Sequence, residues 1–129
     1  MLDHYWDFYR GKNVLITGGL GFLGSNLAQV LVPRGAAVTV LDAQFPQYGA
    51  NPFNLQGIAD RVRVIAGDIR DPKVLSVVVP GSDVIFNFAA QVSYLDSGTE
   101  PFWDLDLNCV GHLHVLEAVM KYAPSAKIC

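Results

Sequence analysis

Apolar runs of strand length alternate along the chain with segments of helical periodicity. Short runs rich in Val, Ile and Leu are typical of strands buried on both faces of a parallel sheet. Such runs cover residues 13–17, 37–42, 61–67 and 83–90. Helical spacing covers residues 22–32, a short segment that begins at Pro72 with Asp71 as its cap, and residues 101–122. Between residues 43 and 60 the pattern predicts a polar loop with one helical turn.

Helix-length connections between the strands predict parallel pairing. Two strands joined by a helix cannot form a hairpin, and right-handed crossovers place helices on both faces of the sheet. The expected fold class is α/β, a doubly wound parallel sheet with about four strands. Residues 13–129 form its single domain, and residues 1–12 are expected to be an aromatic leader that packs on it. Pro33 predicts an early end or a bend in the first helix.

Composition excludes several classes of protein. The net charge is -3 and 16% of residues are charged, so no basic face is available for nucleic acid. Cys109 and Cys129 are the only cysteines, too few for a disulfide framework. No apolar run is long enough for a signal peptide or a membrane span, so the cytoplasm is the expected compartment. His112 and His114 are two apart on a helix and point to different sides, so no metal site is expected.

The stretch "TGGLGFLG" at residues 17–24 carries the first functional signal. Its glycines satisfy two spacings, G-x-G-x-x-G from Gly19 and G-x-x-G-x-x-G from Gly18. Either spacing, between a strand and a helix, permits a tight turn and lets the backbone approach a pyrophosphate at the helix N-terminus. A plain turn is the competing interpretation. A phosphate loop of the NTPase type is excluded, because Ser25 and Asn26 follow Gly24 where Lys and Ser or Thr are needed.

Asp42 is the second functional signal. It ends the second predicted strand, 18 residues beyond Gly24, where a carboxylate can accept hydrogen bonds from ribose hydroxyls. A 2'-phosphate at 4 Å from this carboxylate would cost about 4 kcal/mol before screening at an effective dielectric near 20. Ala43 and Gln44 offer no arginine to neutralise it. The residues therefore favour NAD over NADP, although an Asp that merely ends a strand is the alternative.

Five segments in the same order resemble the extended short-chain dehydrogenase/reductases, the NAD-dependent epimerase/dehydratase family that acts on nucleotide sugars. They are "TGGLGFLG", "VTVLD", "GDIRD", "FNFAAQVS" and "NCVGHLHVLEAV". The match runs from about Gly11 to Ile128. It implies a Rossmann fold, bound NAD, a nucleotide-sugar substrate, and hydride transfer to and from NAD at a sugar carbon.

The resemblance also implies roles for individual residues. The pyrophosphate would be surrounded by Gly18, Gly21, Phe22, Leu23 and Gly24, and the adenosine ribose would be held by Asp42. The adenine would contact Asp68 and Ile69. The nicotinamide side would be lined by Ala89, Ala90 and Gln91, and Asn108 would lie near the cofactor. The alternatives are purely structural: Asp68 caps a turn, and Asn108 is a hydrogen-bonded polar residue on a half-buried helix. Helix 101–122 would form a homodimer contact, as its equivalent does in the family, or serve as an ordinary core helix.

The catalytic pair of the family is missing from these residues. Its enzymes use Tyr-x-x-x-Lys, whereas the residues four positions before the lysines here are Phe8, Ile69, Glu117 and Ala123. The chain is therefore predicted to be the NAD-binding part of a nucleotide-sugar epimerase or dehydratase, truncated after about four strands, with no catalytic residues and no activity alone. The alternative is a non-catalytic, dinucleotide-binding regulatory module.

Overall fold

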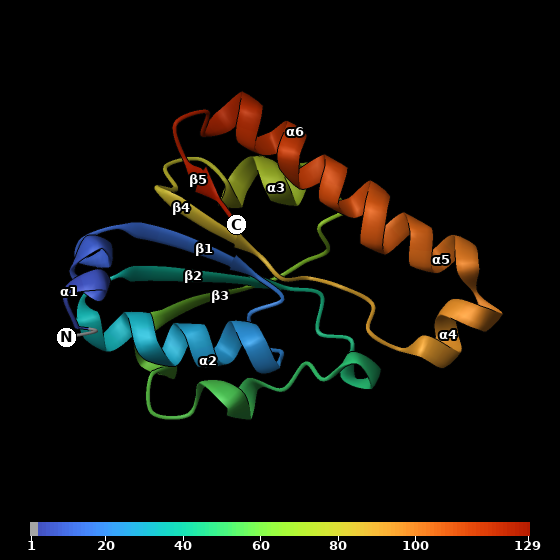
Figure 1. Ribbon diagram of the computed structural model, residues 1–129, viewed down its shortest axis with the longest axis horizontal. Coiled ribbons are helices and arrows are strands. Elements are labelled where there is room, and N and C mark those ends of the chain that lie inside the picture. Colours follow the sequence, from blue (N-terminus) through green and yellow to red (C-terminus); the bar gives the residue numbers. More distant parts are fainter. Residues whose placement is uncertain (1–2) are drawn as a thin grey trace.

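A five-stranded parallel sheet forms the centre of the molecule (Figure 1). The computed structural model describes residues 3–129. In chain order the strands are β1 (Asn13–Thr17), β2 (Ala37–Asp42), β3 (Val62–Ala66), β4 (Val84–Asn87) and β5 (Lys127–Ile128). Their order across the sheet is β3-β2-β1-β4-β5, and every neighbouring pair is parallel. The predicted α/β, doubly wound class is confirmed, but the number of strands is five because the last residues pair with β4.

Helices cover both faces of the sheet because successive strand residues alternate in direction. On one face Val14, Ile16 and Val40 pack with Ala28 and Leu31 of α2 (Phe22–Leu31). On the other face, strand residues pack against α3 (Pro72–Val78) and α6 (His112–Tyr122). This second cluster includes Leu15, Leu41, Ile85, Leu75, Val115 and Val119. Two apolar layers thus hold the sheet, which explains the continuous apolar runs in the strands.

The first helix ends where proline predicts. α2 ends at Leu31 and passes into the 3-10 turn η2 (Val32–Arg34), whose Pro33 cannot donate a helical hydrogen bond. β4 is shorter than predicted, because the N–H of Ala89 turns to the side-chain oxygen of Thr17 at 3.1 Å instead of continuing the ladder. The loop after β2 contains three 3-10 turns where one was expected: η3 (Pro46–Tyr48), η4 (Pro52–Leu55) and η5 (Ala59–Arg61).

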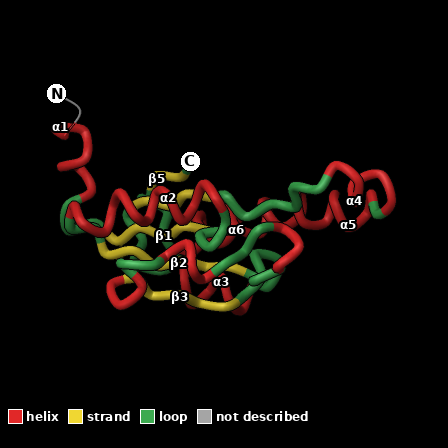
Figure 2. Tube along the Cα trace, turned by 90° about the horizontal axis from the view of Figure 1, so that it is seen from below, coloured by secondary structure: helices red, strands yellow, loops and turns green. Residues whose placement is uncertain are grey.

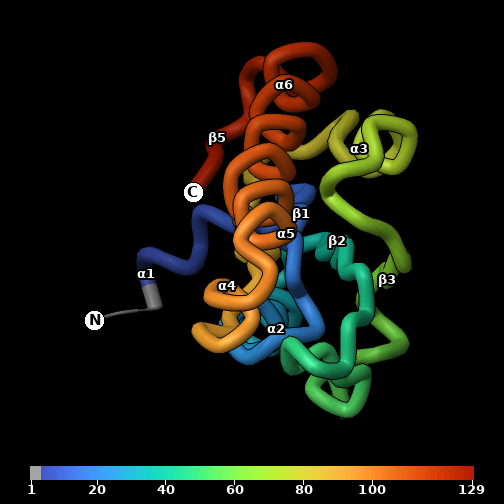
Figure 3. The backbone as a smooth tube through the Cα atoms, turned by 90° about the vertical axis from the view of Figure 1, so that its right-hand side faces the viewer, coloured from blue at the N-terminus to red at the C-terminus, as the bar shows by residue number. Residues whose placement is uncertain are grey.

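The predicted helix 101–122 is a rod of three consecutive segments (Figure 3). They are α5 (Pro101–Leu105), the π-helical η6 (Asp106–Gly111) and α6. A further helix that was not predicted, α4 (Tyr94–Thr99), precedes them, and the Ser93 hydroxyl caps it by accepting the N–H of Asp96 at 3.2 Å. α4 and α5 extend beyond the carboxyl ends of the strands (Figures 1 and 2).

The N-terminal segment packs on the domain through aromatic rings. It forms α1 (Asp3–Trp6) and η1 (Asp7–Tyr9), and Trp6 and Tyr9 lie against the α2-side core. The Tyr9 and Phe86 ring centres are 6.2 Å apart, and the Arg34 guanidinium lies 5.2 Å from the Trp6 ring centre. Met1 and Leu2, the first residues of the expected leader, lie outside the described residues. No helix within residues 3–129 has the length and apolar character needed to cross a membrane.

Candidate functional site

The backbone after β1 is packed so closely against other backbone that Gly18 and Gly24 have no room for a side chain. Gly18 adopts φ +66, and a Cβ there would lie 2.8 Å from the backbone nitrogen of Ala89. A Cβ at Gly24, in the first turn of α2, would lie 2.6 Å from the Gly18 carbonyl oxygen. These glycines therefore bring the turn, the start of α2 and the end of β4 into direct backbone contact.

The two possible glycine spacings are distinguished by where the glycines lie. Gly19 faces the core, where a Cβ would lie 2.5 Å from the Val40 side chain. Gly18, Gly21 and Gly24 instead line a cleft at the carboxyl ends of the strands. The G-x-x-G-x-x-G spacing is thus the one that borders the cleft, and Gly19 serves the packing of the turn on β2.

The N-terminus of α2 opens into this cleft. Gly21 is its N-cap, and the N–H of Ser25 makes the helix's first backbone bond, to the Gly21 carbonyl at 3.1 Å. In a helix the N–H groups before that one have no acceptor within the helix, and they carry the positive end of the dipole. Phe22, Leu23 and Gly24 thus present N–H groups suited to an anion.

Asp42 lies directly against the glycine turn. Its carboxylate accepts the N–H of Leu20 at 2.9 Å and the N–H of Gln44 at 2.8 Å, and the residue is buried. Gln44 has φ 59, a left-handed conformation that the Asp42 contact helps to hold. The end of β2 and the turn after β1 are therefore locked together, with the carboxylate on the wall of the cleft.

A polar chain behind the turn joins β1, β4 and α6, and sequence reasoning did not find it. The buried Thr17 hydroxyl donates to the Asn87 side-chain oxygen at 2.7 Å, and the Asn87 side-chain nitrogen lies 2.7 Å from Nδ1 of His112. Donation from the amide requires an unprotonated Nδ1 on His112. Because Thr17 also accepts the Ala89 N–H, this chain sets where the segment after β4 leaves the sheet.

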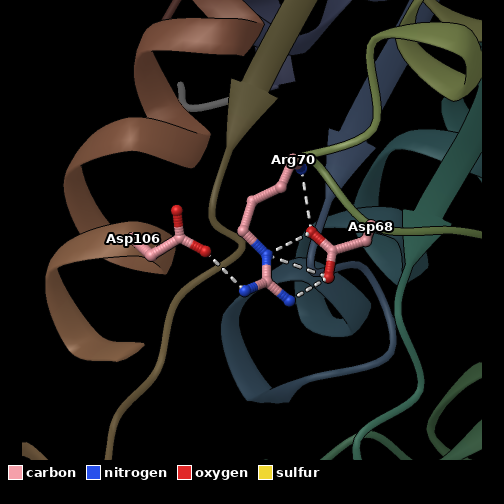
Figure 4. Close-up of polar contacts among 3 residues, drawn as sticks. All are labelled: Asp68, Arg70 and Asp106. Carbon is pink, nitrogen blue, oxygen red and sulfur yellow. Dashed lines mark hydrogen bonds and ion pairs between the residues drawn. The ribbon is translucent and has the colours of Figure 1, made fainter. Parts of the chain in front are cut away.

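A charged cluster of Asp68, Arg70 and Asp106 lies beside the cleft, and its Asp68 is part of the cleft lining (Figure 4). Arg70 donates from Nη2 to Asp68 at 2.6 Å and from Nε to both Asp68 oxygens, and Nη1 donates to Asp106 of η6 at 2.7 Å. Burial raises the pKa of Asp68, but the Arg70 hydrogen bonds and positive charge outweigh it and hold that pKa below its ordinary value. The same contacts raise the pKa of Arg70 above its ordinary value. Asp68 is thus held as an ion.

Aromatic rings extend this cluster over the loop after β2. The Arg70 guanidinium lies 4.2 Å from the Trp103 ring centre, a cation–π contact. Trp103 in turn meets Phe45 edge to face at 6.0 Å, and Phe45 meets Tyr48 in the same way at 6.2 Å. α5 and the loop before η4 are therefore joined through rings, two of which, Phe45 and Tyr48, border the cleft.

The cleft has a volume of about 350 Å³. Of the residues predicted for a site, Gly18, Gly21, Phe22, Leu23, Gly24, Asp42, Asp68, Ile69, Ala89 and Ala90 line it. Its lining also includes residues that sequence reasoning missed, among them Ser25, Asn26, Phe45, Tyr48, Asn54, Val92 and Leu107. Val92 lies in the quoted segment "FNFAAQVS", and Ser25 and Asn26 directly follow the glycine stretch, whereas Phe45, Tyr48, Asn54 and Leu107 come from segments that no motif marks. Their positions follow from how the connections fold back over the strand ends.

Gln91 and Asn108, the two remaining predicted residues, bind each other beside the cleft. The Asn108 side chain accepts the Gln91 N–H at 2.8 Å and donates to the Gln91 carbonyl at 3.0 Å, and it also donates to Asp104 at 2.7 Å. Gln91 is buried and donates to the Ser93 carbonyl at 2.9 Å. Asn108 therefore secures the segment after β4 to the π-helical η6.

Comparison with known proteins identifies the family. The family model described as GDP-mannose 4,6 dehydratase matches residues 15–129. The chain belongs to this family of NAD-dependent epimerases and dehydratases. A dTDP-glucose 4,6-dehydratase of Mycolicibacterium smegmatis is 35% identical over 111 residues, which make up 84% of this chain and 33% of that protein.

Solved structures of the epimerase/dehydratase family show the same fold. An epimerase from Methanothermobacter thermautotrophicus superposes with a TM-score of 0.85 at 34% identity, covering 93% of this chain and 35% of that one. The Bordetella bronchiseptica enzyme WbmF, solved in complex with NAD+ and UDP, superposes with a TM-score of 0.82 at 26% identity over 95% of this chain and 36% of that one. The chain thus spans about a third of the length of these relatives.

No metal site accompanies the cleft in the described part of the chain. Among residues 3–129 there is no group of three or more His, Cys, Asp or Glu side chains placed to bind a metal ion. The acidic and basic side chains at the cleft bind one another and the backbone instead, as Asp42 and Asp68 do.

Proposed function

We propose that the chain forms the NAD-binding part of a nucleotide-sugar epimerase or dehydratase. The observation that carries this proposal is the contact of Asp42 with the turn of Gly18 to Gly24, because it places a carboxylate and bare backbone on one cleft. Linked phosphates need close backbone approach and a helix N-terminus, and a ribose needs an acceptor beside them. Membership of an NAD-dependent family supports the same cofactor.

Each part of a bound dinucleotide would lie against residues that follow a different strand of the sheet. The pyrophosphate would lie on the N–H groups of Phe22, Leu23 and Gly24, where a glycine backbone leaves room for it. The adenosine ribose would bind Asp42, and the adenine would bind between Asp68 and Ile69. The nicotinamide end would lie toward Ala89, Ala90 and Gln91, with Asn108 holding that segment. When bound, NAD supplies the hydride acceptor of the reaction.

Asp42 also supports NAD rather than NADP. Its carboxylate is buried and holds two backbone N–H groups, so it cannot swing away from a 2'-phosphate without losing them. The like charges would then repel at contact distance. We expect NADP to bind more weakly than NAD.

The chemistry on the sugar requires groups beyond those in this chain. No Tyr-x-x-x-Lys pair occurs in the 129 residues, so these residues alone would bind NAD without turning over a nucleotide sugar. A dinucleotide-binding regulatory module without catalysis is the second candidate. Reading the coding sequence around the chain separates the two, because an open frame that continues into Ser or Thr and Tyr-x-x-x-Lys supports the enzyme.

Titration calorimetry tests the proposed cofactor directly. The folded chain should take up NAD and NADH, and Gly24→Ala should abolish the heat of binding. Gly98→Ala is a matched control, because a Cβ there meets no atom within 4 Å, its φ is not left-handed, and Gly98 is not part of the cleft lining. Uptake of neither nucleotide at millimolar concentration by a folded sample would contradict the proposal.

The outer face of the α5–α6 rod supports a homodimer as the assembly state. Apolar side chains are exposed at a helical spacing along it, namely Phe102, Leu105, Val110, Leu113, Leu116 and Met120. Exposed apolar side chains that form one contiguous stripe are typical of an interaction site, whereas single exposed apolar residues are common on any surface. A second copy of the chain, packed helix against helix about a twofold axis, would bury the same stripe on both sides.

A further inference from the structure

Arg70 is held on three sides, which gives it a single orientation beside the cleft. Two edges of its guanidinium bind the carboxylates of Asp68 and Asp106, and its face lies on Trp103. Gly111 lets η6 come this close, since a Cβ there would lie 2.9 Å from Ile69 and 3.3 Å from the Arg70 side chain. The planar fork of arginine suits such bidentate and stacked contacts, whereas lysine cannot reproduce them.

This geometry occupies most, but not all, of the acceptor capacity of Asp68. Oδ1 accepts both the backbone N–H of Arg70 at 2.8 Å and its Nε at 3.0 Å, while Oδ2 accepts Nη2 at 2.6 Å and the longer Nε contact at 3.2 Å. An ionised carboxylate offers about four lone-pair positions. The Nε–H is a single donor shared between the two oxygens, so three N–H groups occupy these positions and one acceptor position remains, on Oδ2, which carries the longer half of the shared bond. Asp68 lines the cleft. Because Arg70 holds Asp68 ionised, this position can accept a hydrogen bond but cannot donate one.

We infer that Arg70 is a positioning residue for base selection, which holds Asp68 so that the cleft accepts a base with an exocyclic amine and rejects one with an oxo group there. The inference rests on the proposed dinucleotide function. An amine donates to the free position on Asp68, whereas an oxo group would bring a second acceptor against a carboxylate that has no proton to offer.

The Arg70–Asp106 contact connects the cleft to the rod of α5, η6 and α6. Asp106 lies in η6, two residues before Asn108, which secures the segment after β4. Arg70 therefore links the wall of the cleft at Asp68 to the π-helical segment, and π-helical turns occur often at functional sites. Loss of Asp106 would free one edge of Arg70 but leave its fork on Asp68 in place.

The test compares NAD with nicotinamide hypoxanthine dinucleotide, in which an oxo group replaces the adenine amine. We expect the wild-type chain to bind NAD about ten- to a hundredfold more tightly in calorimetry, the range for a hydrogen bond to a charged group. Arg70→Met should reduce this ratio about tenfold or more. Asp106→Asn should reduce it by less, and Arg10→Gln, in the exposed ion pair with Asp7, should leave it unchanged.

A conservative variant distinguishes a change in the orientation of Asp68 from a general loss of folding stability. Arg70→Lys retains the positive charge without the planar fork, so a folded Arg70→Lys sample with a reduced ratio supports the orientation of Asp68 as the cause. Asp68→Asn should bring the ratio close to one, because its amide nitrogen can donate to the oxo group. The pH profile is a further readout: the wild-type ratio should hold to a lower pH than the Arg70→Met ratio, since Arg70 favours the ionised form of Asp68.

The outcomes separate the two proposals. If wild type binds both dinucleotides and the Arg70 variants weaken both equally, the role of Arg70 in base selection is overturned and the proposed function stands. If a folded wild type binds neither dinucleotide, the proposed function is overturned, and this inference with it. A ratio that falls in Arg70→Met and Arg70→Lys, with Arg10→Gln unchanged, supports the inference.

Discussion

The carboxylate of Asp42 accepts the backbone N–H of Leu20 across 2.9 Å, although 22 positions separate the two residues in the chain. Through this bond the end of β2 holds the glycine turn that follows β1. A second bond, from the N–H of Gln44, fixes the same carboxylate from its own loop. The carboxylate is therefore part of the scaffold of the cleft as well as its expected ribose ligand.

Replacing Asp42 should weaken folding and binding together. In Asp42→Ala two N–H groups lose their acceptor, and we expect the free energy of unfolding to fall by about 1–3 kcal/mol. Urea denaturation measures this change, and calorimetry should show loss of NAD uptake. Asp60→Ala, at an exposed position in η5, is the control and should change neither. Wild-type stability in Asp42→Ala would show that water replaces the carboxylate at no cost.

Adding one methyl group at Gly24 should be far more harmful than adding it at Gly98. A Cβ at Gly24 would lie 2.6 Å from backbone atoms of Gly18 and Gly19, which cannot move aside as a flexible side chain could. We expect Gly24→Ala to lose about 1–3 kcal/mol of stability. Gly98 lies in α4 with no atom within 4 Å, so Gly98→Ala should be neutral or stabilise by up to about 1 kcal/mol. Thermal unfolding of both variants decides the point, and equal effects would contradict the close packing of the turn.

Acid should destabilise the chain partly through Asp68. Its pKa is lower in the folded state than the ordinary value of 3.8, so the folded protein binds fewer protons there than the unfolded protein near that pH. The stabilisation is complete above the unfolded pKa and is lost as the pH falls through the folded pKa. Urea unfolding between pH 6 and pH 3 should show a shallower loss of stability in Asp68→Asn than in wild type. Parallel curves for the two proteins would show that Asp68 does not contribute to the loss of stability in acid.

A charge on the exposed stripe of the α5–α6 rod should separate the proposed homodimer. Leu113 is 56% exposed, and Leu113→Glu would place a carboxylate between two apolar faces. Sedimentation velocity should show a dimer for wild type and a monomer for this variant. Val77→Glu is the matched control, since Val77 is 62% exposed on α3 and is not part of the stripe. A monomeric wild type at high concentration would contradict the proposed contact.

The order and most of the bounds of the central elements could be predicted from local pattern. β1 and β2 have the predicted bounds, Asp71 caps α3 by accepting the N–H of Lys73, and Pro33 ends α2. These features depend on neighbours within a few positions, such as apolar runs, caps and breakers. α4, two of the three 3-10 turns after β2 and the π-helical η6 were missed, because packing between distant segments shapes them more than local propensity does.

The amino-acid sequence by itself determined the glycine spacing after a strand, the carboxylate at the end of the next strand and the family to which they belong. These are local features, and a strand followed by a helix can be read from periodicity over a dozen residues. Only the tertiary structure decided that Gly18 rather than Gly19 borders the cleft, that Asp42 binds Leu20, and that Arg70 joins Asp68 to Asp106. The physical reason is that these contacts connect residues far apart in the chain, and their geometry exists only once the crossovers have packed on the sheet.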